Sequence, residues 1–390
     1  MKLPDDVRRD LARRFQRKHR EWLIGEFTEN PWPLEIALGL PTEQAALRQV
    51  DGVRAWVTAW RHWQGIGTLS WCERHWKALG VQQLPDKLNL HSPGEVAQWI
   101  GEGTRWERAR SRYQTLTARW PVLARQLPKY YDVLAGYCDE DFSRMVAVLD
   151  WVINHPHSNL YPRQLPVSGL DSKWLDGRRG LLTDLMATMR EDPSTDRDFY
   201  KRCGLKAPPL LVRMRVLDQT LRARVGGLCD ITAPVEELAM APLSALHVFI
   251  VENLQTGLAM TDMPGAVVFM RLGYNVDILA RLPWLAPAQC IYWGDLDTHG
   301  FAILNRARSY LPDLRSVLMD EDTLLRHKAL WVDEKEQNPA MELALLTKKE
   351  QSLYRDLKEQ RWGQNVRLEQ ERIDWDTAWG ALQRSLFQDP

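Results

Sequence analysis

The sequence has few cysteines, no net charge and no long hydrophobic run. Its 390 residues include five cysteines, and no two of them form a CxxC pair. An odd number of scattered cysteines argues against a disulfide framework or a zinc site and indicates reduced thiols. No stretch approaches the roughly 18 apolar residues of a membrane-spanning helix. Residues 1–20 lack the apolar core of a secretory signal. We therefore expect a cytoplasmic protein with no membrane partner.

The basic residues are clustered although the total charge is zero. Residues 1–20 contain eight Lys or Arg, and residues 105–129 and 201–224 contain seven each. A local basic surface can bind phosphates even when the whole chain is neutral. The first of these segments has the apolar spacing of a helix. This basic helix could lie along a DNA backbone, or it could be a solvated face or a docking surface for a protein.

The pattern of apolar residues predicts a multidomain α+β fold that begins with a helical arm. We expect this N-terminal arm domain to span residues 1–165 and to be mostly helical. Within it, Trp56, Trp60 and Trp63 fall on one helical face. Aromatic side chains at this spacing could stack on bases, but a stripe of this kind is more typical of a hydrophobic core.

A second unit is expected over residues 166–240. A helical pattern is followed there by two strand-like pieces, at 210–218 and 230–240, which suits a small winged-helix-like DNA-binding unit. Arg213 and Arg215 alternate in "VRMRV" and would share one face of a strand. They could hold phosphates, or the segment could be a plain amphipathic strand.

The C-terminal domain, residues 241–390, has a different pattern. Short, fully apolar runs alternate with helix-like segments, which is typical of a parallel sheet with both faces covered. The expected strands lie at 245–252, 265–270, 289–297 and 314–320.

Acidic residues follow two of these expected strands. Glu252 follows "HVFIV", and Asp295 and Asp297 follow "CIYWG". Alternate residues in a strand share one side, and the carboxyl ends of parallel strands meet at one edge of the sheet. Three converging carboxylates repel one another unless a cation lies between them. Mg²⁺ or Mn²⁺ would meet this need and would support phosphoryl transfer. The plain alternative is that the aspartates only cap the next helix.

Further residues are expected around this acidic edge. Gly294 and Gly300 would let the chain turn, and His299 would orient a ligand or phosphate. Arg306, together with the two strand arginines, is a candidate for holding the DNA backbone. A charged C-terminal set could support the cleft, although a solvated helix face explains it better. Its members are Lys348, Lys349, Arg367, Glu369 and Glu371.

Around these acids the sequence resembles the Toprim domain of topoisomerases, primases and some nucleases. That family has a glutamate after its first strand and a DxD motif after its third, which match Glu252, Asp295 and Asp297. The segments "YPRQLPVSGLDSKWL", "YWGDLDTHGFAIL" and "NVRLEQERI" more closely resemble the JetD-like nuclease subunit of the Wadjet plasmid-defence system.

The resemblance implies a homodimer related to the topoisomerase VI A subunit, with a C-terminal Toprim catalytic domain. It implies a metal-dependent endonuclease that cuts closed circular plasmid DNA beside an SMC-kleisin complex of the condensin type. The nucleophilic tyrosine of the topoisomerase relatives has no counterpart here, because Tyr200 lacks the surrounding signature. We therefore expect direct hydrolysis without a tyrosyl–DNA intermediate.

Three other functions are compatible with part of the pattern. A haloacid-dehalogenase phosphatase also has a DxD after a strand, but it has Thr or Val where this chain has His299. A non-catalytic DNA-binding adaptor would keep the acids as structural groups. A topoisomerase VI-like strand-breaking enzyme would need the missing tyrosine.

Overall fold

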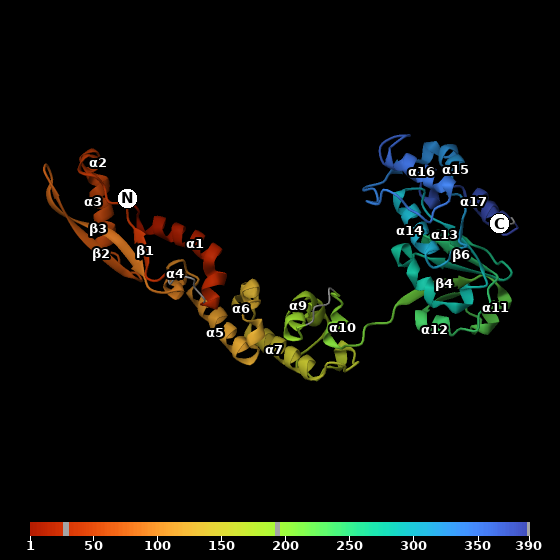
Figure 1. Ribbon diagram of the computed structural model, residues 1–390, viewed down its shortest axis with the longest axis horizontal. Coiled ribbons are helices and arrows are strands. Elements are labelled where there is room, and N and C mark those ends of the chain that lie inside the picture. Colours follow the sequence, from red (N-terminus) through yellow and green to blue (C-terminus); the bar gives the residue numbers. More distant parts are fainter. Residues whose placement is uncertain (26–30, 192–195, 388–390) are drawn as a thin grey trace. The chain divides into compact units, whose positions relative to one another are not determined.

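The computed structural model describes residues 1–25, 31–191 and 196–387, and the chain divides into two compact units (Figure 1). Unit 1 is Met1–Pro208 and unit 2 is Pro209–Pro390. Each unit has its own hydrophobic core. In the described part of the chain, no helix has the length and apolar character needed to cross a membrane.

Unit 1 combines helices with a small antiparallel sheet. The sheet has the order β1-β3-β2, formed by β1 (Leu34–Ala37), β2 (Thr68–Trp76) and β3 (Gly80–Leu90). The expectation of a mostly helical arm over 1–165 did not include these three strands. Strand β2 carries charged residues among its tryptophans, and its pairing with β3, which continues across a register shift between Ser70 and Trp71, outweighs any helical pattern.

The helices of unit 1 lie beside this sheet and extend away from it (Figure 1). They are α1 (Pro4–Ile24), α2 (Glu43–Arg48), α3 (Val50–Arg61), α4 (Pro93–Trp99), α5 (Gly103–Arg119), α6 (Tyr131–Gly136), α7 (Asp139–Asn154), α8 (Ser172–Asp176), α9 (Arg179–Met189) and α10 (Phe199–Cys203), with 3-10 turns η1 (Pro121–Leu123), η2 (Leu127–Tyr130) and η3 (Pro162–Gln164).

Tryptophans form part of the core of unit 1. Trp56 and Trp60 are 2% and 1% exposed, and both indole groups donate a hydrogen bond to the carbonyl of Lys2, at 2.9 and 2.8 Å. Trp63 is partly buried and packs against this core. The prediction of a core stripe is confirmed, because the two buried rings are not accessible for stacking on bases.

Unit 2 is built on a mixed sheet of six strands, in the order β5-β4-β7-β6-β8-β9. Neighbouring strands from β7 to β9 are parallel, while β4 pairs antiparallel with both β5 and β7. The parallel sheet is thus confirmed, with an antiparallel extension. The strands are β4 (Leu211–Val216), β5 (Asp230–Pro234), β6 (His247–Val251), β7 (Ala266–Met270), β8 (Gln289–Trp293) and β9 (Arg315–Ser316).

The segment 166–240 does not form one separate unit. Its helices α8 to α10 belong to unit 1, whereas β4 and β5 belong to the large sheet of unit 2. Strands β4 and β5 do pair with each other, as expected. They join the sheet because Met214, Arg215 and Val216 also pair with β7.

Helices and turns pack around the sheet of unit 2, and a short strand pair lies near its acidic edge. The pair is antiparallel and consists of β10 (Val332–Asp333) and β11 (Val366–Arg367). The other elements are α11 (Gln219–Arg224), α12 (Val235–Ala239), α13 (Leu254–Ala259), η4 (Gly273–Arg281), η5 (Pro283–Leu285), α14 (Thr298–Arg308), α15 (Glu321–Arg326), η6 (Lys328–Leu330), α16 (Lys348–Lys358), η7 (Gln370–Arg372) and α17 (Trp375–Ser385).

Candidate active site

The ends of β6 and β8 bring acidic residues to one edge of the sheet. These strands are parallel, and Val251 lies opposite Trp293 at their carboxyl ends. The next residues along the two strands are Glu252 and Gly294. A Cβ atom added at Gly294 would lie 2.4 Å from Oε1 of Glu252. The glycine therefore makes room for the glutamate, which is a more specific role than the expected turn.

Glu252 lies in an environment that opposes its ionisation. The hydroxyl of Tyr292, in the middle of the sheet, donates a short hydrogen bond to Oε1 of Glu252. The pKa of Glu252 is raised to about 8, chiefly by burial and to a smaller extent by the charges of Asp295 and Asp297, whereas the tyrosine bond acts in the other direction. The negative charges of the two aspartates therefore oppose the ionisation of Glu252, while the binding of a metal ion by the three carboxylates stays a prediction.

Asp297 caps α14 and also faces the acidic edge. Its Oδ1 accepts a hydrogen bond of 2.7 Å from the amide of Gly300, and the residue is 3% exposed. Burial raises its pKa to about 6, with smaller contributions from nearby acids. Asp297 thus caps the helix, as the alternative interpretation predicted. Capping is not its only contact, because its second oxygen, Oδ2, lies beside Arg367.

Arg367 joins the two aspartates. Its guanidinium group lies 2.6 Å from Oδ2 of Asp295 and 3.2 Å from Oδ2 of Asp297. The amide of Gln370 donates a bond of 2.8 Å to the other oxygen of Asp295. Strand β11 delivers this arginine, because Leu368 bridges to Leu296, the residue between the aspartates. One protein cation thus pairs with both aspartates.

A fourth acid, Glu334, lies behind the start of α14. Its Oε1 accepts hydrogen bonds from the amide and hydroxyl of Thr298, at 3.1 and 2.6 Å, and from the amide of His299 at 3.3 Å. Glu334 is 3% exposed, and within the described residues its Oε2 atom is buried without a hydrogen-bond partner. The sequence analysis missed Glu334, which lies in a loop with no recognisable motif.

His299 is held in one orientation beside the acidic edge. Its Nε2 lies 3.0 Å from the carbonyl of Glu336, so this nitrogen donates, and Nδ1 then accepts from the hydroxyl of Tyr274 at 2.6 Å. Asn338 completes the chain by donating to the same hydroxyl at 2.8 Å. The contact of His299 with a ligand or phosphate stays a prediction.

Two of the predicted DNA-binding arginines form ion pairs within unit 2. Arg213 binds both oxygens of Asp230, at 2.9 and 2.7 Å, across the β4–β5 pair. Arg306 lies 3.4 Å from Asp277. Both guanidinium groups remain partly exposed, and their contact with DNA stays a prediction.

Arg215 has a structural role that the sequence did not show. Its Nη1 atom donates to the carbonyl groups of Gly257 and Leu258, at 2.8 and 2.6 Å, near the end of α13. A guanidinium at a helix C-terminus satisfies carbonyl groups that have no partner in the helix. This arginine therefore ties α13, which follows Glu252, to β4.

The charged C-terminal set divides into two groups. Lys348 and Lys349 are exposed at the start of α16, as a solvated helix face predicts. Arg367 instead lies at the acidic edge. Glu371 accepts a bond of 2.7 Å from the side chain of Asn253, the residue after Glu252. The interpretation as a solvated helix face was therefore wrong for Arg367, whereas Glu371 is exposed and Glu369 pairs with Arg372 at 2.9 Å.

The donor chemistry of this edge suits a hard divalent cation, since it offers carboxylate oxygens from Glu252, Asp295 and Asp297. In the described ranges, however, no three acidic, histidine or cysteine side chains are placed to hold a metal ion. The guanidinium of Arg367 supplies the positive charge between the aspartates. A metal ion would therefore compete with Arg367 for the carboxylate groups of the two aspartates.

Fold and site together define a two-unit α/β protein with an acidic centre at the carboxyl edge of a mixed sheet. Residues 204–382 match a family model described as Wadjet protein JetD, C-terminal, and residues 4–187 match one described as an uncharacterized protein conserved in bacteria, N-terminal. The two matches together support a JetD-like Wadjet protein. A comparison with curated proteins finds no match.

Proposed function

We propose that this chain is a metal-dependent DNA endonuclease of a Wadjet anti-plasmid system. The match to the JetD family model supports the role in a Wadjet system. The observation that carries the enzymatic part is the convergence of Glu252, Asp295 and Asp297 at one sheet edge, where the two aspartates contribute to the raised pKa of the glutamate. The proposed reaction is hydrolysis of closed circular DNA, performed with an SMC-kleisin complex of the same system.

In this proposal Glu252, Asp295 and Asp297 hold Mg²⁺ or Mn²⁺. The ion, when bound, would polarise the phosphodiester and lower the pKa of the attacking water. The chain prepares the ligands in two ways. The Tyr292 hydroxyl fixes one oxygen of Glu252 and keeps its proton, because burial raises the tyrosine pKa well above its ordinary value. The Gln370 amide fixes one oxygen of Asp295.

Arg367 has to release at least part of its contact with the aspartates before they can bind an ion. Once released, its guanidinium would be suited to a phosphate oxygen, since guanidinium groups bind carboxylates and phosphates with the same geometry. The same pairing is the observation that favours a second candidate, a DNA-binding adaptor in which the acids are structural.

The remaining features of the proposal concern assembly and intermediates. Two copies of the chain in a homodimer would act on opposite strands and give a double-strand break. A topoisomerase VI-like covalent mechanism has less support, because Tyr200 lies on α10 in unit 1 and its hydroxyl accepts a bond of 2.6 Å from Arg179.

The decisive experiment incubates the purified protein and its SMC-type partner complex with closed circular and linear DNA in Mn²⁺. We expect cleavage of circular DNA by the native chain and at least a hundredfold slower cleavage by Glu252→Ala and Asp295→Ala. Asp262→Asn is a matched control, since Asp262 is an exposed acid of unit 2 that pairs with Arg222.

Each outcome separates the candidates. Full cleavage by Glu252→Ala would refute the acidic centre and favour the adaptor. A protein–DNA adduct that survives denaturation would point to the topoisomerase type instead. Loss of cleavage in Asp262→Asn as well would show that any change in the charge of unit 2 is harmful, and the assignment of the site would fail.

A further inference from the structure

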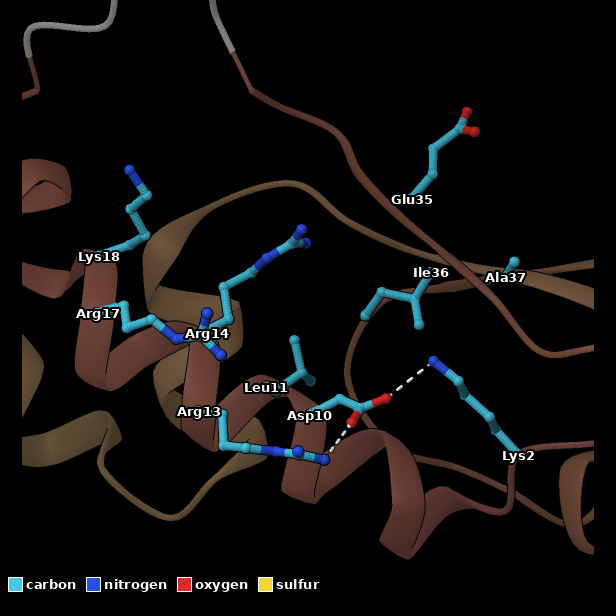
Figure 2. Close-up of a pocket in the computed structure, with 10 residues that line it drawn as sticks. All are labelled: Lys2, Asp10, Leu11, Arg13, Arg14, Arg17, Lys18, Glu35, Ile36 and Ala37. Carbon is cyan, nitrogen blue, oxygen red and sulfur yellow. Dashed lines mark hydrogen bonds and ion pairs between the residues drawn. The ribbon is translucent and has the colours of Figure 1, made fainter.

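A groove with a strongly basic lining lies between α1 and β1 in unit 1. Figure 2 shows its lining, with Arg14 extending from α1 toward the segment that carries Glu35 and Ile36. The groove has a volume of about 560 Å³. Its five basic side chains are Lys2, Arg13, Arg14, Arg17 and Lys18.

The acids in the lining are already engaged by other cations. Asp10 accepts hydrogen bonds of 2.8 Å from both Lys2 and Arg13, as the dashed lines in Figure 2 show. Glu35 accepts one of 2.8 Å from Lys87, on β3. Both acids in the lining are therefore already paired with lysine or arginine side chains.

Lys18 pairs with Glu21 at 2.7 Å, so Arg14 and Arg17 are the two cations of the groove that remain. Both are exposed, and in the described part of the chain neither has a carboxylate partner. Like charges one turn apart on a helix repel each other, and the acids that pair with Arg13 and Lys18 offset this repulsion only in part. A bound anion beside Arg14 and Arg17 would reduce it further.

Helix α1 does not need these arginines to fold. Its packing face consists of Val7, Leu11, Phe15 and Trp22, all of which are buried. The arginines lie on the remaining surface, where Gln or Glu would form an equally good helix. Their charge is therefore left for a function outside the packing of unit 1.

The second basic segment of unit 1 behaves differently. On α5, Arg110 pairs with Glu107 at 2.9 Å and Arg105 with Glu102 at 3.3 Å. Farther along the helix, Arg112 and Arg119 are also paired with acids. These four arginines of α5 thus have acidic partners within the fold, unlike Arg14 and Arg17 on α1.

We propose that the α1 groove binds the phosphate backbone of duplex DNA, with Arg14 and Arg17 as its principal contacts. The choice of DNA as the polyanion rests on the proposed function. An acidic protein fits the groove less well, because protein interfaces are anchored by apolar and aromatic side chains in pockets. The apolar lining residues Leu11 and Ile36 are only 1% and 8% exposed. Guanidinium groups and phosphates need no such anchor.

The test measures binding of a fluorescent duplex of about 30 base pairs by anisotropy, a length that covers several phosphate contacts. It uses the full chain in a chelator, so that the acidic centre holds no ion. The variant is Arg14→Gln/Arg17→Gln, and the matched control is Arg105→Gln/Arg110→Gln, which removes the same charge from α5. Each lost phosphate contact should lower the slope of log affinity against log salt by about 0.9.

We expect the slope of the Arg14/Arg17 variant to fall by about 1.8, with roughly a tenfold loss of affinity per arginine at about 0.1 M salt. The α5 control should keep the native slope. Native slope and affinity in the Arg14/Arg17 variant would overturn the proposal. So would unchanged DNA binding with lost binding to the SMC-type complex, which would identify the groove as a protein-docking surface.

Glu252→Ala separates this result from the proposed function. It should bind the duplex with native affinity in the chelator, because Glu252 lies in unit 2 and not in the groove. Cleavage by Glu252→Ala in Mn²⁺ would refute the nuclease site and leave the groove result standing. Weaker binding by Glu252→Ala than by the α1 variant would place the main DNA contact elsewhere and overturn the groove.

Discussion

Replacing Glu252 with Gln should make unit 2 more stable at pH 8 and leave it nearly unchanged at pH 5. Burial holds the pKa of Glu252 at about 8, against an ordinary value of 4.5. Between these values the folded chain keeps a proton that the unfolded chain has released. The native protein therefore loses stability as the pH rises from about 4.5 toward 8. Gln has the same shape, can accept the Tyr292 hydrogen bond and has no charge to lose.

The size of the effect follows from the pKa. A tenfold change in proton affinity is worth about 1.4 kcal/mol, so the full difference amounts to about 5 kcal/mol. Part of the surface of Glu252 remains accessible to solvent. Screening by this solvent reduces the expected stability difference to roughly 3 kcal/mol. For a unit of this size, about 3 kcal/mol corresponds to a Tm difference of roughly 6–12 °C.

The assay is thermal unfolding of the full chain in a chelator at both pH values. Hydrogen exchange of the β6 and β8 amides assigns the transition that belongs to unit 2. Glu236→Gln is the control, since Glu236 is an exposed acid that pairs with Arg281. The reasoning is refuted if Glu252→Gln and the native chain lose stability in parallel as the pH rises. Mn²⁺ added at pH 8 should stabilise the native chain more than Glu252→Gln.

Two further substitutions test the surroundings of the acids. Arg367→Gln should lower the free energy of unfolding of unit 2 by roughly 1–3 kcal/mol at pH 8. The loss should be smaller at pH 5, where Asp297, with a pKa of about 6, is protonated. Equal losses of stability at both pH values in denaturant unfolding would contradict this. Gly294→Ala should reduce DNA cleavage as strongly as removal of Glu252, because its Cβ would lie 2.4 Å from the carboxylate. Gly180→Ala, on α9 with open space around the new Cβ, should have native activity, and equal activity of both alanine variants would refute this account of Gly294.

Buried strands were the most predictable part of the fold. Strand β7 is buried at every position, so its apolar run indicated a strand within one residue of its observed start. Strand β2 in unit 1 gave no such signal, because most of its residues are only half-buried or exposed. Its stability comes from pairing with β3 over its whole length, and no property of its own residues encodes that partner.

The acidic centre was only partly predictable for a related reason. Glu252, Asp295 and Asp297 stand directly after apolar strands, so the rule for parallel sheets places them at one edge. Arg367 is 72 residues from Asp295 along the chain. It reaches the site through the β10–β11 pair and the Leu296–Leu368 bridge. These pairings are short, and their residues have no pattern that identifies a partner.

The distance in sequence between Arg367 and the aspartates sets the order in which the centre can be completed during synthesis. The aspartates leave the ribosome first, and 72 residues separate Asp295 from its guanidinium partner. Until those residues have followed, the nascent chain has an acidic sheet edge without its internal cation. Contacts of such long range also form slowly. The docking of the segment that carries Arg367 is therefore expected to be a late step in the folding of unit 2.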